Sequence, residues 1–200
     1  MTVAVIVTTY NRPDALAAVL AGYFAQSVSG FELLIADDGS TDETRKLVAE
    51  HAARAPVPLR HVWQEDRGFR AGAARNRAAA QTNAETLIFA DGDCVPGRDF
   101  VQQHLALSEA GYFLSGNRVL LSENFTRHVL AERAPIHEWH ASRWLRAWAR
   151  SSSTVSARNL LGVNGSTARS SRPLSIFSRW LRQRTNVVLP EPEGPMMTTT

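Results

Sequence analysis

The sequence predicts an α/β fold, a three-layer sandwich in which helices cover both faces of a mainly parallel central sheet. Two observations predict it. Short apolar runs alternate with helical segments through the first 110 residues, and this alternation is typical of parallel strands joined by right-handed crossover helices. Two of these runs also end at carboxylates, at the strand ends where open α/β sheets bind their ligands.

Four runs are predicted to be strands, because each is rich in β-branched or aliphatic residues and is bounded by polar or turn residues. The last of them is stopped by Asp91 and Gly92 and is expected to be short and buried. The four predicted strands are Val3–Thr8, Phe31–Ala36, Leu59–Trp63 and Thr86–Ala90.

Helices are predicted between and after these strands. Asn11 is expected to cap the first helix, with Pro13 in its first turn. Ser40 and Glu43 have capping-box spacing and are expected to open the second. The helical segments run from Asn11 towards Gln26, from Ser40 through Val48, from Gly72 to Gln81, and from Asp99 to Ala110.

The pattern loosens after residue 111. We expect short strands at Tyr112–Ser115 and Asn117–Leu121, and a helical region over Thr126–Arg150 that is interrupted at Pro135. The predicted division is a core of residues 1–121, a helical segment of residues 122–164, and an atypical tail of residues 165–200. The tail is rich in Ser, Thr, Arg and Pro, so we expect it to pack poorly, without a further strand, apart from one short helix near Leu174–Arg184.

The composition of the chain indicates the cellular compartment in which the protein is expected. The chain has 200 residues, 44% of them hydrophobic and 20% charged, as in soluble globular domains. We find neither a secretory signal nor a run approaching the roughly 20 apolar residues that cross a bilayer. The single cysteine, Cys94, excludes an intrachain disulfide and fits a reducing compartment. We therefore expect a cytoplasmic protein, in which Cys94 is a small buried residue rather than a nucleophile.

Charge is distributed unevenly along the chain. Residues 1–110 carry 10 Lys and Arg against 14 Asp and Glu, whereas residues 111–200 carry 12 against 5. The basic half also contains Trp139, Trp144 and Trp148, interleaved with arginines. A solvated basic face is the commoner explanation of such a bias, and contact with phosphates or a membrane surface is the alternative. We expect peripheral membrane contact at the inner face of the membrane and no nucleic-acid partner.

Carboxylates that follow two of the predicted strands are the strongest functional signal. Asp91 and Asp93 lie just beyond the fourth strand, and Asp37 and Asp38 follow the second. Carboxylate oxygens are the ligands that Mg²⁺ or Mn²⁺ accepts when it bridges a protein to a diphosphate. The alternative is a pair of ordinary turns, with Asp38 in a helix cap.

Two further segments belong to the same predicted edge. Thr8, Thr9 and Tyr10 end the first strand, and a tyrosine ring can stack on a nucleotide base. Residues 68–76 form a glycine-containing loop that enters a helix and carries Arg70 and Arg75, side chains that can meet an anion. The alternative for Arg75 is a salt bridge to a neighbouring carboxylate.

Together these segments resemble the family 2 glycosyltransferases of GT-A fold, in order and in spacing, over about residues 1–121. The segments are Val5–Arg12, Asp37–Asp42, Gly72–Asn76 and Phe89–Asp93. The resemblance implies a GT-A-like fold and transfer of a sugar, with inversion, from a nucleotide-diphosphate donor to a glycan or lipid-linked acceptor. It further suggests cell-surface polysaccharide or lipopolysaccharide synthesis.

The resemblance also assigns residue roles. Thr8, Tyr10 and Asp38 would hold the base and ribose, Arg75 would lie beside the donor, and Asp91 would face the ribose or sugar. Asp93 would ligate Mn²⁺ or Mg²⁺. In this family an acidic segment after the acceptor-binding strands usually supplies the general base.

Here the sequence departs from the family pattern. The segment Asn159–Asn164 resembles the strand that precedes the base, but the glycine- and acid-containing continuation is absent, and no aspartate follows Asp99. The catalytic base therefore stays unassigned. A truncated or frame-shifted gene would explain this departure, which leaves a non-catalytic remnant that binds a nucleotide, or nothing, as the alternative function. A sugar-nucleotide pyrophosphorylase is disfavoured, because the first strand-to-helix loop lacks a glycine-rich basic signature.

Overall fold

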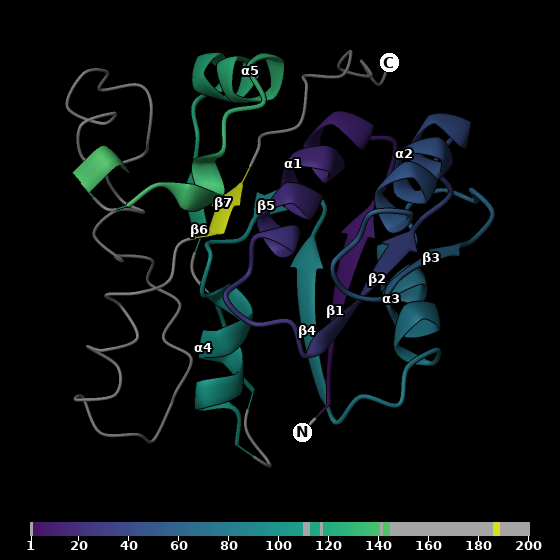
Figure 1. The fold of residues 1–200 in the computed structure, drawn as a ribbon. Coiled ribbons are helices and arrows are strands. Elements are labelled where there is room, and N and C mark those ends of the chain that lie inside the picture. Colours follow the sequence, from purple (N-terminus) through teal and green to yellow (C-terminus); the bar gives the residue numbers. More distant parts are fainter. Residues whose placement is uncertain (1, 110–112, 117, 141, 145–185, 189–200) are drawn as a thin grey trace, which may run out of the picture.

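The structure is a computed structural model that describes residues 2–109, 113–116, 118–140, 142–144 and 186–188. Its elements alternate between strand and helix through the first hundred residues (Figure 1). In chain order they are β1 Val3–Thr9, α1 Pro13–Phe24, β2 Phe31–Asp37, α2 Asp42–Ala52, β3 Leu59–Trp63, α3 Ala71–Ala79, β4 Thr86–Asp91, β5 Cys94–Val95, α4 Phe100–Leu107, β6 Arg118–Leu120, α5 Glu123–Ala131, the 3₁₀ helix η1 Ile136–Glu138 and β7 Asn186–Val188.

The central sheet has the order β3-β2-β1-β4, and all of its neighbouring strands are parallel. β1 lies inside the sheet, because it pairs with β2 on one side and β4 on the other. This arrangement confirms the predicted α/β class with a mainly parallel sheet. The four predicted strands agree with the observed ones to within one residue at each end.

Alternating residues of the central strands bury into two separate apolar clusters, as the two-residue period of a strand requires. Val5 and Ile35 join the cluster beneath α1, α2 and α4. Ile6 and Leu34 join the opposite cluster, which α3 covers through Ala74 and Ala78. Helices therefore cover both faces of the sheet, and the predicted three-layer sandwich is confirmed.

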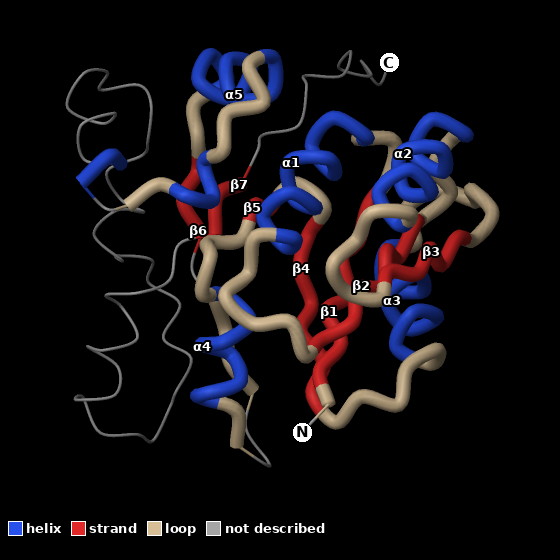
Figure 2. The backbone as a smooth tube through the Cα atoms, in the orientation of Figure 1, coloured by secondary structure: helices blue, strands red, loops and turns tan. Residues whose placement is uncertain are grey.

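A second, smaller sheet has the order β5-β7-β6 and lies beside α1 (Figure 2). β7 pairs parallel to β6 and antiparallel to β5. The expectation that no strand follows residue 165 is therefore wrong at Asn186–Val188. Three residues are too few to show a strand signal in the sequence. The predicted helix at Leu174–Arg184 lies outside the described residues.

Residues that follow β6 in the chain pack on the main core. Val129 of α5 and Ile136 of η1 are buried in the same cluster as Leu16 of α1. The predicted interruption of the helical region at Pro135 is present, since α5 ends at Ala131 and a 3₁₀ turn follows Pro135. Residues 142–144 are helical again, and residues 145–150 lie outside the described residues. The predicted strand at Tyr112–Ser115 is absent from its described residues 113–115.

Two predicted helix caps are wrong, and the side chains concerned instead tie the first two strand ends together. Asn11 has a φ of 47°, and its side-chain oxygen accepts a hydrogen bond from the Thr41 backbone at 2.9 Å. The Ser40 hydroxyl accepts from the Asn11 backbone at 2.9 Å. The observed N-cap residues, Arg12 and Thr41, make no side-chain capping bond. The residues that look like helix caps in the sequence therefore form hydrogen bonds between two loops, an arrangement called here the loop-to-loop clasp.

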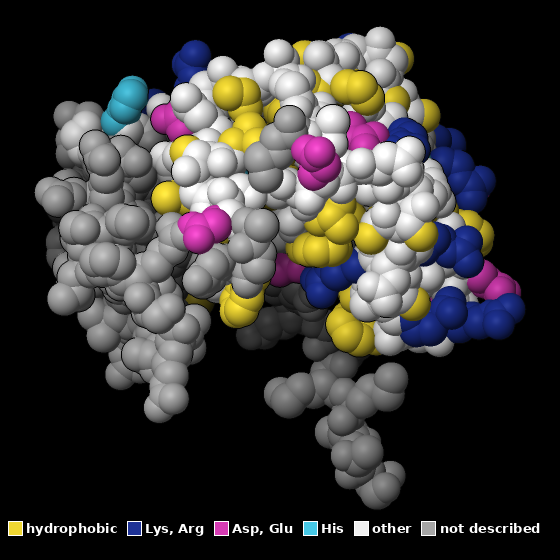
Figure 3. All heavy atoms as spheres, turned by 90° about the horizontal axis from the view of Figure 1, so that it is seen from below, with side chains coloured by type: hydrophobic (Ala, Val, Ile, Leu, Met, Phe, Trp, Pro, Cys, Tyr) yellow, Lys and Arg dark blue, Asp and Glu magenta, His cyan; other side chains and the backbone are white. Residues whose placement is uncertain are grey.

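The two ends of the parallel strands differ in character. Figure 3 views the molecule from below, where the amino ends lie, and shows basic and acidic side chains interspersed with apolar ones. At these ends Arg60 of β3 pairs with Glu32 of β2 at 2.6 Å.

None of the helices in the described part of the chain combines the length and apolar character that a bilayer span requires.

Candidate functional site

The carboxyl ends of β1, β2, β3 and β4 are held together by backbone hydrogen bonds that continue past the paired residues. Gly92 N donates to Thr8 O at 2.6 Å, and Asp38 N donates to Thr9 O at 3.0 Å. On the other side of β2, Gln64 N donates to Asp37 O at 3.1 Å. The residues that follow the strands are therefore brought to one edge, as the parallel sheet predicts.

Arg75 connects two of these strand ends. Its Nε donates to the Thr8 hydroxyl at 2.8 Å, and its Nη2 donates to Asp91 Oδ1 at 2.7 Å. Ala74 and Ala78 bury α3 against the sheet and so fix the neighbouring arginine at this edge. The salt bridge considered as an alternative for Arg75 is thus present, and it lies within the predicted site. Arg118 approaches the other oxygen of Asp91 to 3.7 Å.

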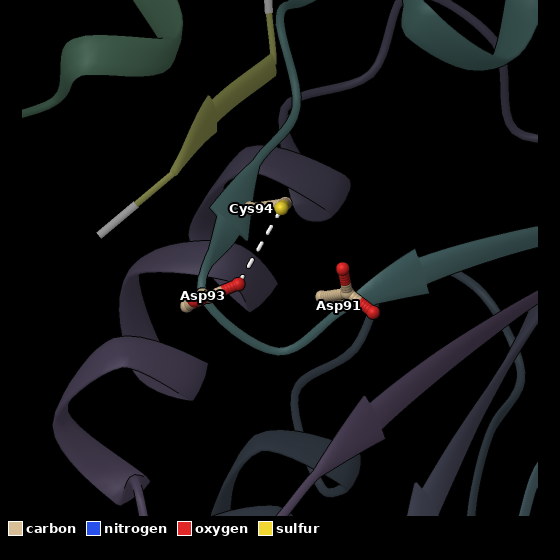
Figure 4. A group of neighbouring side chains, drawn as sticks. All are labelled: Asp91, Asp93 and Cys94. Carbon is tan, nitrogen blue, oxygen red and sulfur yellow. Dashed lines mark hydrogen bonds between the residues drawn. The ribbon is translucent and has the colours of Figure 1, made fainter. Parts of the chain in front are cut away.

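Asp91, Asp93 and Cys94 form the candidate metal site (Figure 4). One ligand atom from each lies within 4.8 Å of the others. Asp91 ends β4, Asp93 lies in the turn that follows, and Cys94 begins β5. The Cys94 thiol donates to Asp93 Oδ1 at 3.4 Å. Burial raises the pKa of Cys94 to about 12, so this side chain remains a thiol. The predicted burial of Cys94 is confirmed.

The carboxylates of this cluster fit a hard divalent cation. Burial raises the pKa of Asp93, and the nearby carboxylate of Asp91 also raises it. The hydrogen bond from the Cys94 thiol lowers the same pKa, but by less than burial raises it. A cation at this point would offset both the desolvation and the repulsion. Oxygen ligands suit Mg²⁺ or Mn²⁺, whereas a protonated thiol does not. The residues present therefore fit the expected ion.

Asp38 is 3% exposed and lies where β2 ends. Gln64 Nε2 donates to its Oδ1 at 2.6 Å, and the Arg70 backbone N–H donates to its Oδ2 at 2.6 Å. Each carboxylate oxygen retains further acceptor capacity. The carboxylate is thus oriented by Gln64, which directly follows β3, and by Arg70, which belongs to the loop of residues 68–76 predicted to lie at this edge.

Tyr10 follows β1 and is 50% exposed. Its hydroxyl donates to Asp66 Oδ2 at 2.9 Å. Asp66 belongs to the same segment as Gln64, so this segment contacts two of the three residues predicted to hold the base and ribose, Tyr10 and Asp38. The strand-end rule that found Asp38 and Asp91 would have found Gln64 and Asp66 as well, had it been applied to the third strand.

Asp37 is fully buried and has a structural part at this edge. Its Oδ1 accepts from the Ser40 backbone at 2.8 Å, and its Oδ2 lies 2.7 Å from His61 Nε2. Burial opposes ionisation of Asp37, but the hydrogen bonds from His61 and Ser40 outweigh it and lower the pKa. A carboxylate with a lowered pKa stabilises the fold above the pKa it has in the unfolded chain, and that stability is lost as the pH falls through its folded pKa.

We expect Asp37→Asn to lower the free energy of unfolding at pH 7 by about 1–3 kcal/mol, because it leaves buried donors imperfectly paired. The difference between parent and variant should shrink as the pH falls from the ordinary pKa of aspartate through the lower pKa of Asp37 in the folded protein, where the parent loses its ionised carboxylate. Urea unfolding of both proteins at pH 7 and at acidic pH measures this. A difference that stays the same at both pH values would contradict the role assigned to the ionised Asp37.

All six predicted site residues therefore lie at the carboxyl edge of the sheet. Thr8, Arg75 and Asp91 are in direct contact, and Asp93 lies beside Asp91. Asp38 and Tyr10 are joined through the segment after β3. The continuation after Asn164, where the family pattern would have a base, lies outside the described residues.

The chain is similar in sequence to several known proteins. The validoxylamine A glucosyltransferase of Streptomyces hygroscopicus subsp. limoneus is 39% identical over 105 residues, 51% of this chain and 22% of that protein. The hyaluronan synthase of Pasteurella multocida is 32% identical over 103 residues, 51% of this chain and 10% of that protein. The crystal structure of S. aureus TarS in complex with UDP-GlcNAc has 27% identity and a TM-score of 0.49, covering 62% of this chain and 34% of that one.

The matches to these relatives span about a fifth of the glucosyltransferase and a tenth of the synthase. The model of glycosyl transferase family 2 matches residues 4–168, which include β1, β2, α3 and β4 with all the strand-end residues described above. The predicted GT-A-like resemblance is thereby confirmed, and the chain belongs to glycosyl transferase family 2.

Proposed function

We propose that the chain binds a nucleotide-diphosphate sugar at the carboxyl edge of its sheet and transfers the sugar, with inversion, to a glycan or lipid-linked acceptor. The observation that carries this proposal is the convergence of Thr8, Arg75 and Asp91 in direct contact, with Asp93 beside them. This cluster places a cation-binding carboxylate next to an arginine, as a diphosphate leaving group requires. Membership of the family and the name of the glucosyltransferase relative support it.

The base and ribose would lie against Tyr10, Thr8 and Asp38. The half-exposed Tyr10 ring offers a face for stacking. Asp38 is held by Gln64 and Arg70 N, and its remaining lone pairs suit an imide N–H or a ribose hydroxyl. Asp91 would face the ribose or sugar while its other contacts, to Arg75 and Arg118, keep the carboxylate in place.

The diphosphate would lie near Asp93, which would hold Mn²⁺ or Mg²⁺. When bound, the ion supplies positive charge that offsets the charge developing on the leaving diphosphate. Arg75 would add a fixed positive charge close to the same group. The described residues thus supply binding and charge stabilisation for the departing half of the donor.

Inversion requires the acceptor oxygen to attack the anomeric carbon from the face opposite the diphosphate, as the bond to the diphosphate oxygen breaks. The hydroxyl proton must pass to a base within hydrogen-bond reach. We leave this base unassigned. The chain without such a base would be a non-catalytic nucleotide binder, and the missing acidic pattern after Asn164 favours this second candidate.

We further propose that residues 122–164 lie on the acceptor side. The acceptor pathway would be cell-surface polysaccharide or lipopolysaccharide synthesis, carried out in the cytoplasm with peripheral contact at the inner face of the membrane. What supports membrane contact is a cation beside two tryptophans, Trp139 and Trp144, which are themselves partly buried against the main core. The Arg143 guanidinium lies 4.3 Å from the Trp139 ring centre, and Trp144 packs on Trp139 at 5.1 Å.

Release of nucleotide diphosphate from a panel of UDP- and GDP-sugars, with Mn²⁺ present, tests the proposed activity. We expect slow hydrolysis of one donor, which stops in Asp93→Ala. Binding of a nucleotide diphosphate without release from any donor sugar, even with a range of glycan acceptors, would favour the non-catalytic binder. If the protein neither binds a nucleotide diphosphate nor releases one from any donor, both candidates are contradicted.

A further inference from the structure

The segment Gln64–Arg70, which follows β3, encloses the proposed base-binding residues. It begins with Gln64, which donates to Asp38, and ends with Arg70, whose backbone N–H donates to the same carboxylate. Between them, Asp66 accepts the Tyr10 hydroxyl at 2.9 Å. The segment therefore contacts the proposed site at three points, although none of these contacts was predicted.

The position of Asp66 is fixed by its backbone as well as by its side chain. Gly39 has a φ of 99°, and a Cβ built there would lie 2.5 Å from Asp66 Cα and 2.6 Å from Asp66 N. Only glycine allows the two backbones to approach this closely. On the other side, Asp66 Oδ1 accepts from the Gly68 backbone at 3.0 Å. Asp66 is thus held from both directions, and its second oxygen is aimed at Tyr10.

We propose that Asp66 is a positioning residue for the donor's nucleotide base, acting through the hydrogen bond that orients the Tyr10 ring. The inference rests on the proposed function, since it requires a base at Tyr10. The hydrogen bond to Asp66 raises the pKa of the Tyr10 phenol, which therefore keeps its proton and remains a donor. A half-exposed ring without this partner would rotate freely and would have to be ordered when the base binds.

The cost of ordering one such side chain sets the expected effect. Pre-orienting a rotamer-rich side chain improves affinity by about 3- to 10-fold. The effect should be confined to ligands that contain a base, because Asp66 contacts Tyr10 and none of the residues around Asp93. Inorganic pyrophosphate with Mn²⁺ is therefore the reference ligand, since it engages only the diphosphate end of the site.

Titration calorimetry with UDP, GDP and pyrophosphate, each with Mn²⁺, tests this in Asp66→Ala, Tyr10→Phe and the double variant. We expect each single change to weaken binding of the preferred nucleotide by about 3- to 10-fold and to leave pyrophosphate binding unchanged. Because both changes remove the same hydrogen bond, the double variant should be no weaker than Asp66→Ala alone. Tyr10→Phe keeps the stacking ring, so its loss isolates the hydrogen bond.

Two further variants serve as controls for the calorimetric titrations. Asp66→Asn retains an acceptor oxygen and should recover most of the nucleotide affinity. Arg67→Ala alters the same segment at an exposed ion pair with Glu65 and should bind like the parent. Equal weakening of nucleotide and pyrophosphate in Asp66→Ala, or additive effects in the double variant, would overturn the inference. A parent that binds pyrophosphate but neither nucleotide would instead remove the proposed base site, and this inference with it.

Discussion

Asp93→Ala should lose the Mn²⁺-dependent part of donor binding, weakening UDP or GDP by more than about 100-fold, since loss of even an outer partner of a metal commonly costs 10- to 100-fold. The reason is geometric. Asp91 already forms a salt bridge with Arg75 at 2.7 Å and lies 3.7 Å from Arg118. Among the described residues, Asp93 forms no salt bridge of this kind, so its carboxylate is the one left to bind a cation. Calorimetric titration with and without Mn²⁺ measures the effect.

The same variant should fold normally in the absence of metal. Burial raises the pKa of Asp93, which means that its ionised form is less favourable in the folded than in the unfolded chain. Removing it should leave the metal-free unfolding temperature unchanged or higher. The matched control is Asp99→Ala. Asp99 is an exposed aspartate at the start of α4 that makes no side-chain cap bond, and its alanine variant should bind like the parent. Undiminished Mn²⁺-dependent binding in Asp93→Ala would contradict the assigned ligand.

Gly92→Ala should damage both the fold and the site, although its backbone conformation would accept alanine. A Cβ at this position would lie 2.7 Å from Thr8 O and 3.1 Å from Thr9 Cβ. Since Gly92 N already donates to Thr8 O at 2.6 Å, the new methyl group can only separate the ends of β1 and β4. We expect a loss of about 1–3 kcal/mol in the free energy of unfolding, as for other overpacked sites.

The separation should also move Asp91 and Asp93 relative to Thr8, and we expect donor binding to fall by more than about 10-fold, because small displacements of positioned groups are costly. Urea unfolding and calorimetry measure the two effects. Gly30→Ala is the control, because no heavy atom lies within 4 Å of the position its Cβ would take. Parent-like stability and binding in Gly92→Ala would show that this close approach does not hold the two carboxylates in place.

The parallel sheet and the site at its edge follow from local sequence patterns. Strands such as Val3–Thr9 and Phe31–Asp37 are predominantly apolar and buried, as is typical of parallel strands covered on both faces. Once the strands are inferred to be parallel, the residues after them must meet at one edge. That is why the sequence alone is enough to place Thr8, Asp38 and Asp91 together.

The features that the sequence did not indicate depend on contacts between distant segments. Asn11 and Ser40 have the side chains of helix caps, but a loop-to-loop clasp satisfies them instead. β5 and β7 are two and three residues long and form by pairing with each other rather than by propensity. The part played by Asp66 depends on Gly39 lying against it, a contact that no local pattern encodes.

Titration calorimetry of the parent with UDP and with GDP, in the presence of Mn²⁺ and then of a chelator, tests the central claim most directly. That claim is that the carboxyl edge of the sheet binds a nucleotide diphosphate through a metal ion held by Asp93. We predict that one of the two nucleotides binds with Mn²⁺ and that its affinity falls sharply when the metal is removed. Absence of binding by both nucleotides with Mn²⁺, or binding that is equally tight with the chelator, would contradict it.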